Sequence, residues 1–87
     1  MAVASRLKIE YDAGEDILSI RFARPQNDAA IEVDDDVFVH INPRTKRVVS
    51  VTVLNFRRRF TQGNVSQVLP VVGDLLPDAA LRHALPA

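Results

Sequence analysis

Six cationic side chains lie within sixteen residues of this sequence, and they are the residue types best suited to binding a ligand. Three of them form an arginine run between the aromatic residues Phe56 and Phe60, and the others surround a proline turn. Arginine forks bind phosphate groups, and aromatic rings stack on bases. The spacing therefore indicates a nucleic-acid surface or partner surface made of Arg44, Lys46, Arg47, Arg57, Arg58 and Arg59.

The same aromatic pair also allows a structural interpretation. If the segment is helical, Phe56 and Phe60 lie on one face and can anchor it to the core while the arginines stay in solvent. The net charge of zero also differs from the basic balance that is usual in nucleic-acid-binding proteins. Residues 1–40 carry a net charge of −5 and residues 41–87 one of +5, so these charges can pair across strands or form separate patches.

Carboxylates in turns are a second group of side chains that could do chemistry. Tyr11, Asp12 and Asp16 are expected to structure a turn, with Asp12 accepting loop N–H bonds and Asp16 capping the start of the next strand. Together with Glu15, the two aspartates have the oxygen ligands that a hard cation prefers, but the segment is not an EF-hand loop. We therefore expect a structural role and no metal. The acidic run 34–36 is expected to be a solvated turn.

Groups typical of catalysis are sparse in the sequence. His40 lies in a predicted strand and His83 in a predicted helix, and neither has another histidine at ligand spacing. The serines have no Gly-x-Ser-x-Gly context, and there is no cysteine to act as a nucleophile or to form a disulfide. The sequence contains Ser, His and Asp residues, but their spacing does not indicate a catalytic triad. We expect the protein not to be an enzyme and to hold no cofactor.

The elements that must position these residues are strands. Apolar and polar residues alternate with a period of two over residues 7–22 and 37–54, and a charged or proline-containing turn interrupts each unit. A short strand over 29–33 is expected between them, and the valine-rich segment 47–54 is the strongest strand signal. The pattern predicts an antiparallel meander of four or five strands with one wet face.

The sequence changes character after residue 62, where it becomes apolar and is punctuated by prolines. Asp74 is expected to be the N-cap of a helix over about residues 75–85, with Pro77 and Asp78 in its first turn. The predicted fold class is therefore α+β, with a sheet domain over 1–62 and an apolar tail over 63–87 whose helix packs on the sheet or on a partner subunit. The residues expected at an oligomer interface are Val68, Leu69, Val71, Val72, Leu76, Leu81 and Leu85.

One part of the pattern resembles a known family of small prokaryotic proteins, the domain of unknown function 2283. The residues that carry the resemblance are Tyr11-Asp12, Asp16, Leu18 and Ile20, followed by the strand at 49–54. Ser50 and Thr52 stand where the family usually has Gly and Glu, and the tail from Phe60 onward lies outside the resemblance. The resemblance implies a compact sheet domain without an assigned role. Some members look like the partner half of small toxin-antitoxin pairs, an associational inference.

Two classes of function follow as expectations. The first is a non-enzymatic protein-interaction module, a homodimer and an antitoxin-like partner of a small toxin, that uses a strand edge or the apolar tail. Deletion of residues 63–87 should then abolish association while the sheet still folds. The alternative is weak nucleic-acid binding through the arginines. The chain start lacks the apolar core of a signal peptide, and no apolar run approaches the ~18 residues that span a bilayer, so we expect a cytoplasmic protein without membrane contact.

Overall fold

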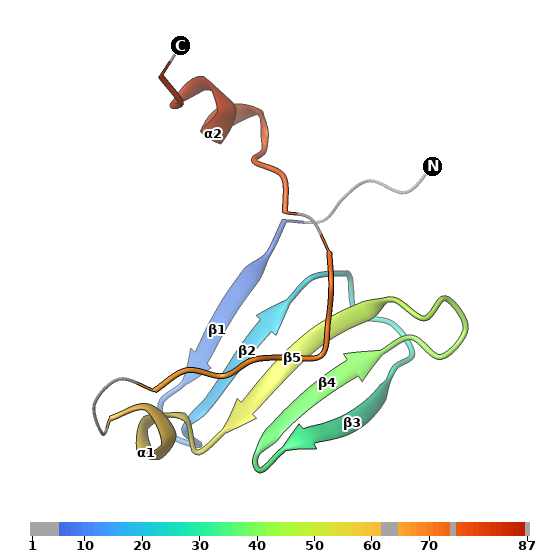
Figure 1. The fold of residues 1–87 in the computed structure, drawn as a ribbon, viewed down its shortest axis with the longest axis vertical. Coiled ribbons are helices and arrows are strands. Elements are labelled where there is room, and N and C mark those ends of the chain that lie inside the picture. The colour runs from blue at the N-terminus through green and yellow to red at the C-terminus, as the bar shows by residue number, and fades with distance from the viewer. Residues whose placement is uncertain (1–5, 62–64, 74, 87) are drawn as a thin grey trace.

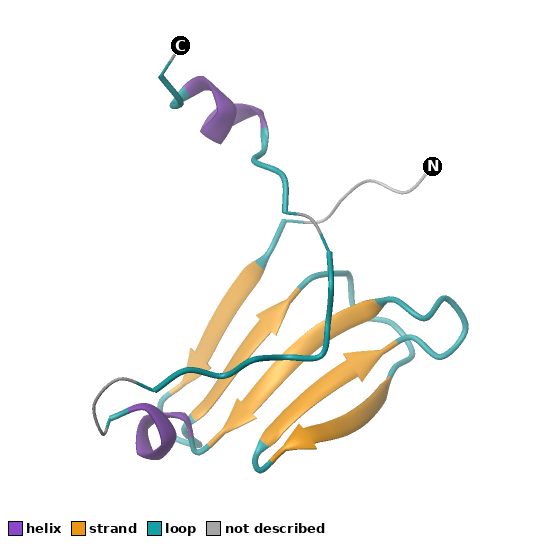
Figure 2. Ribbon diagram, viewed as in Figure 1, coloured by secondary structure: helices purple, strands orange, loops and turns teal. Residues whose placement is uncertain are grey.

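The computed structural model describes residues 6–61, 65–73 and 75–86, and its centre is a five-stranded antiparallel sheet (Figures 1 and 2). The strands are β1 (Lys8–Asp12), β2 (Ile17–Arg21), β3 (Ala29–Asp34), β4 (Val37–Ile41) and β5 (Val48–Leu54). They are followed by the short helices α1 (Phe56–Phe60) and α2 (Ala79–His83). The α+β class, the five strands and the presence of a C-terminal helix are as the sequence predicts.

The order of the strands in the sheet is β1-β2-β5-β4-β3. Strands β3, β4 and β5 form a consecutive meander, while β1 and β2 form a hairpin whose second strand pairs with β5. The connection after β2 therefore carries the chain to the far edge of the sheet. Pro25 lies in this connection, where it donates no hydrogen bond to a ladder.

A valine core lies on one face of the sheet. The register places Val51 between Ile20 of β2 and Val39 of β4, and Val37 is the opposite partner of Val53. Val37 and Val39 are fully buried, because they sit at the centre of this face. Since side chains alternate across a strand, the intervening polar residues all point to the opposite face. The sheet thus has one apolar and one wet face, as predicted.

Two segments after β5 cover the apolar face. Phe56 and Phe60 of α1 pack against the valine core, with ring centroids 4.9 Å apart. The prediction that a helical turn would anchor both rings is therefore confirmed. The extended segment 65–73 then runs across the same face (Figure 1), and its Leu69 and Val71 pack against the core. The first part of the tail thus belongs to the sheet domain structurally.

Helix α2 begins later and is shorter than the sequence predicts. It spans Ala79–His83, and its N-cap is Asp78, whose carboxylate accepts a 2.9 Å bond from Leu81 N–H. The cap predicted at Asp74 lies outside the described residues. Pro77 favours extended backbone at the residue before it, which explains the late start. No residue of α2 is buried, and the helix stands away from the sheet (Figure 1).

In the described ranges, no helix has the length and apolar character needed to cross a bilayer.

Candidate functional site

The turn between β1 and β2 is fastened to α1 through Asp16. The Asp16 carboxylate accepts a 2.5 Å hydrogen bond from the Tyr11 hydroxyl and a 2.9 Å bond from Arg57 N–H, and its carbonyl accepts from Phe56 N–H at 3.0 Å. Asp12 accepts from Glu15 N–H at 3.1 Å, as the sequence predicts for a turn aspartate. Asp16 differs from its expected role, because it caps α1 and not the next strand.

The local backbone explains why Asp16 takes this role. The N-cap residue of α1 is Asn55, which has a left-handed backbone with φ 52° and makes no side-chain cap bond. The first N–H groups of a helix have no partner inside the helix, so a carboxylate from another element can satisfy one of them. Asp16 itself has φ 58°, a conformation that Asp tolerates better than most residues. The hairpin turn and the helix therefore hold each other in place.

These bonds shift the acidity of both partners. The hydrogen bond from Tyr11, followed by that from Arg57 N–H, lowers the pKa of Asp16 below its ordinary value. The same hydrogen bond raises the pKa of the Tyr11 hydroxyl. Within the described residues, no three side chains of metal-ligating type gather as a cation site. The turn carboxylates act here as acceptors for N–H and O–H groups.

The arginines of α1 pair with acidic residues from the first half of the chain. Arg59 donates to the Asp35 carbonyl at 2.7 Å, to the Asp34 carboxylate at 3.1 Å and to the side-chain oxygen of Gln67. Arg57 lies 3.8 Å from the Asp16 carboxylate. The backbone N–H of Asp35, with smaller contributions that include Arg59, lowers the pKa of Asp34. The acidic turn is therefore not simply solvated, since it ties α1 and the tail to the sheet.

The other three predicted cations lie at the opposite end of β5. Arg44, Lys46 and Arg47 are exposed in the turn between β4 and β5, whereas α1 follows the last residue of the strand (Figure 1). Seven residues of extended chain separate the two groups by about 20 Å. The fold therefore does not unite the six cations into one surface.

The tail residues predicted at an interface divide into two sets. Leu69 and Val71 pack on the core of their own chain. The remaining predicted residues are exposed, with exposed fractions of 86% for Val68, 103% for Val72, 87% for Leu76, and 58% for both Leu81 and Leu85. Leu69 and Val71 are only partly buried, and Val71 also lines an open hollow, so the second set differs in being exposed and not packed on the core.

Beside the point where the tail leaves the sheet there is an apolar hollow of about 300 Å³. Its lining comes from the end of β2, the start of β5 and the tail, and consists of Phe22, Val48, Val71, Val72, Gly73 and Leu75. The hollow has the chemistry needed to accept an apolar side chain.

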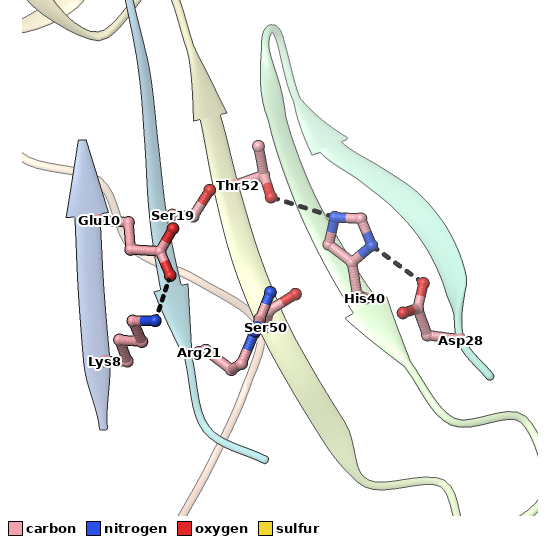
Figure 3. A pocket seen from close by; sticks show the side chains of 8 residues that line it. All are labelled: Lys8, Glu10, Ser19, Arg21, Asp28, His40, Ser50 and Thr52. Atoms are coloured by element: carbon pink, nitrogen blue, oxygen red, sulfur yellow. Dashed lines mark hydrogen bonds and ion pairs between the residues drawn. The ribbon is translucent and has the colours of Figure 1, made fainter. Parts of the chain in front are cut away.

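A second hollow, of about 210 Å³, lies on the wet face of the sheet (Figure 3). It is lined by polar side chains from four strands and the loop before β3, namely Lys8, Glu10, Ser19, Arg21, Asp28, His40, Ser50 and Thr52. His40 Nδ1 lies 3.0 Å from the Asp28 carboxylate, and its Nε2 lies 3.1 Å from the Thr52 hydroxyl. Sequence reasoning missed this cluster, because it treated His40 as a lone histidine and did not align the polar positions of neighbouring strands.

Residues 8–57 of the chain match the family described as "Protein of unknown function (DUF2283)". The chain belongs to this family. No curated protein and no solved structure matches the chain. The DUF2283 match covers the whole sheet and the start of α1, so it includes Tyr11, Asp16 and the Arg57 N–H that they hold.

The comparison also separates the two hollows. All residues that line the polar hollow lie within the DUF2283 match. The apolar hollow combines Phe22 and Val48 from the matched region with residues 71–73 and Leu75, which lie beyond it. The tail lies outside the matched DUF2283 region.

Proposed function

We propose that this DUF2283 protein is a non-enzymatic interaction module that forms a homodimer through its C-terminal segment 75–85. The observation that carries the proposal is the exposure of apolar residues in this segment. No residue of α2 is buried, and Leu76, Leu81 and Leu85 are all exposed. The Asp78 cap and the exposed Arg6–Asp78 ion pair hold the start of α2, but a helix this short gains most of its stability when its apolar side is covered. A second copy of the chain is the partner that is always present at equal concentration.

The dimensions of the chain support a missing partner. Its accessible surface is 7294 Å², whereas a compact monomer of 9.7 kDa exposes about 5,100 Å². The radius of gyration is 14.9 Å, against about 12 Å for a compact chain of this length. The excess surface is roughly 2,000 Å² for one chain and so roughly 4,000 Å² for two, which lies within the total of about 2,000–5,000 Å² that obligate homodimers bury.

The apolar hollow beside the tail is the binding site that we propose for the partner. Its walls include Phe22 and Val48, which belong to the rigid sheet, and it lies where the chain departs toward α2. A two-fold axis would let each copy place its own leucines in the hollow of the other, so that both tails are used at once. Such an exchange fills an apolar site with apolar side chains and removes both from water.

The edge strands are the competing surfaces. Strand β3 has a bulge between Glu32 and Asp34, and charged residues and bulges discourage pairing with another chain. All residues of strand β1 are exposed, with Ile9 70% accessible. A substitution at Ile9 therefore distinguishes dimerisation through an edge from dimerisation through the tail.

A small toxin-like protein is the alternative partner that could bind the same exposed leucines. Tagged protein drawn gently from its native cells would then carry a second polypeptide, identified by mass spectrometry. A homodimer carries none.

Light scattering on a sizing column tests the proposal. The full chain should elute at twice 9.7 kDa, and a variant with Leu76→Asp and Leu81→Asp should elute as a monomer. Ile9→Asp and Ile31→Asp are matched controls on the two edge strands and should remain dimeric. A monomeric wild-type chain, or a monomeric Ile9→Asp variant beside a dimeric tail variant, would overturn the proposal.

A truncation that tests the tail must keep the residues that pack against the valine core. Removal of residues 63–87, as the sequence suggests, also removes Leu69 and Val71, which pack against the valine core. A chain that ends at Gly73 keeps both residues and loses α2. This shorter deletion is therefore the one expected to abolish association while the sheet stays folded.

A further inference from the structure

In the polar hollow on the wet face, the Arg21 guanidinium makes no direct ion pair within the described residues. Lys8 pairs with Glu10 at 3.0 Å, and His40 lies 3.0 Å from the Asp28 carboxylate, so both carboxylates of the hollow are engaged (Figure 3). Within the described part of the chain, no side chain forms an ion pair or hydrogen bond with the Arg21 guanidinium. The pKa of Glu10 is lowered mainly by Lys8 and to a smaller extent by the charge of Arg21, which acts without a direct contact, so the guanidinium N–H groups remain available to a ligand.

The strand register surrounds Arg21 with hydrogen-bonding groups. Arg21 of β2 is the direct partner of Ser50 of β5, and Ser50 is the direct partner of His40 of β4. Ser19 and Thr52 form the next pair on the same face, two residues along each strand. Neighbouring strands lie about 4.8 Å apart, so these groups converge on one place. Figure 3 shows the Arg21 side chain extending beside Ser50.

The protonation pattern of the cluster can be worked out from its acceptors. An ionised Asp28 only accepts, so a neutral His40 must carry its proton on Nδ1 and present Nε2 as an acceptor to the Thr52 hydroxyl. The hydroxyls of Ser19 and Ser50 have no such partner in the described ranges, and they can donate to a ligand. The hollow thus offers the Arg21 fork and two hydroxyl donors on one side of a rigid sheet.

We propose that this hollow binds an oxyanion, a phosphate or carboxylate group of a small ligand, with the Arg21 guanidinium as its main contact. A guanidinium matches the two oxygens of such a group with two parallel hydrogen bonds. The hydroxyls of Ser19 and Ser50 donate to its remaining oxygens. A metal cation is a poorer match, because within the described residues no three side chains of metal-ligating type gather as a cation site.

Amide NMR titration of the full chain tests the proposal, with sodium phosphate and sodium acetate as separate probes and sodium chloride holding the ionic strength constant. The expected result is a saturable shift of amide signals in β2 and β5 around Arg21 and Ser50. Arg21→Gln should weaken the affinity roughly tenfold or more, since that is the contribution of hydrogen bonds to charged groups. Arg58→Gln removes an exposed arginine of α1 and should leave the affinity unchanged.

The two probes distinguish the source of the oxyanion, because tighter binding of phosphate indicates a phosphorylated ligand and tighter binding of acetate a carboxylate ligand. The spectra also report whether each variant is folded. Should Arg21→Gln unfold, Ser50→Ala is the second variant and must weaken binding. Absence of a saturable shift with both probes, or equal affinity of a folded Arg21→Gln and the wild type, overturns the proposal.

Discussion

The Tyr11 hydroxyl donates a 2.5 Å hydrogen bond to the Asp16 carboxylate across the turn between β1 and β2. The same carboxylate receives Arg57 N–H, which lies 41 residues further along the chain. Tyr11 also contacts the Phe56 ring edge-on, with centroids 5.7 Å apart. Tyr11 and Asp16, two of the residues that carry the resemblance to DUF2283, therefore join the first hairpin to the helix that covers the core, whereas Asp12 bonds within the turn.

Asp16→Asn is expected to lower the free energy of unfolding at neutral pH. In acid the same substitution should lower it by less. Because the folded pKa of Asp16 is depressed, its stabilisation is complete above the ordinary carboxyl pKa of about 4 and is lost as the pH falls through the folded value. Urea unfolding at neutral pH and below about pH 3 measures the two differences. Asp35→Asn is the matched control in another acidic turn, and an equal difference at both pH values for Asp16→Asn would contradict the assignment.

Tyr11→Phe tests the same bond from the alkaline side. The raised pKa of Tyr11 means that its stabilisation is complete below the ordinary phenol pKa of about 10 and is lost as the pH rises through the folded value. The wild type should therefore lose its stability advantage over Tyr11→Phe in strong alkali. Thermal unfolding by circular dichroism measures this, and an advantage that persists above the phenol titration would refute the prediction.

Asn42→Ala should destabilise the protein by about 1–3 kcal/mol, because it leaves backbone donors unpaired. Asn42 is only 8% exposed, accepts from Arg44 N–H at 2.9 Å and Thr45 N–H at 3.2 Å, and donates to Gln26 at 2.7 Å. Chemical denaturation gives the difference. Asn27→Ala, in an exposed loop, should change the free energy of unfolding by less than about 0.5 kcal/mol, and equal effects of both variants would contradict this role.

Arg59→Gln is expected to loosen the tail segment 65–73 while the sheet stays intact. Arg59 connects the acidic turn at Asp34 and Asp35 to Gln67 of this segment, and no other arginine of α1 makes these bonds. Amide NMR relaxation should then report faster motion over 65–73. Arg58→Gln is the control of equal charge change, and unchanged motion in Arg59→Gln would show that Leu69 and Val71 hold the segment alone.

The strands could be predicted from the sequence because alternation is a local signal. Residues 49–54 and 18–22 reveal which side chains share a face, and the structure confirms the apolar rows that follow from them. The pairing of β2 with β5 could not be predicted, since both strands alternate in the same way and periodicity does not name a partner. The late start of α2 depends on the single residue Pro77, whose effect on Leu76 outweighed the helical stripe.

The sequence indicates which residues of the candidate site matter more readily than it indicates the contacts that they make. Asp16 is visible as a turn carboxylate, but its bond to Arg57 N–H depends on how α1 lies against the hairpin. The polar hollow becomes apparent only when the register places Arg21, Ser50 and His40 in one row across three strands. The composition of the tail does not reveal which of its apolar residues contact the sheet, since Leu69 and Val71 pack against the core while Val68 and Val72 are exposed.

In the homodimer that we propose, the C-terminal segment of one copy fills the apolar hollow of another. An isotope-filtered NOE spectrum of a mixed sample, with one labelled and one unlabelled population of the full chain, detects contacts between copies alone. Mutual docking predicts cross-peaks that join the Phe22 ring and the Val48 methyl groups to leucine methyl groups of the partner tail, such as those of Leu81 and Leu85. A dimer without cross-peaks at Phe22 and Val48, or a sample without cross-peaks between copies, would contradict the account.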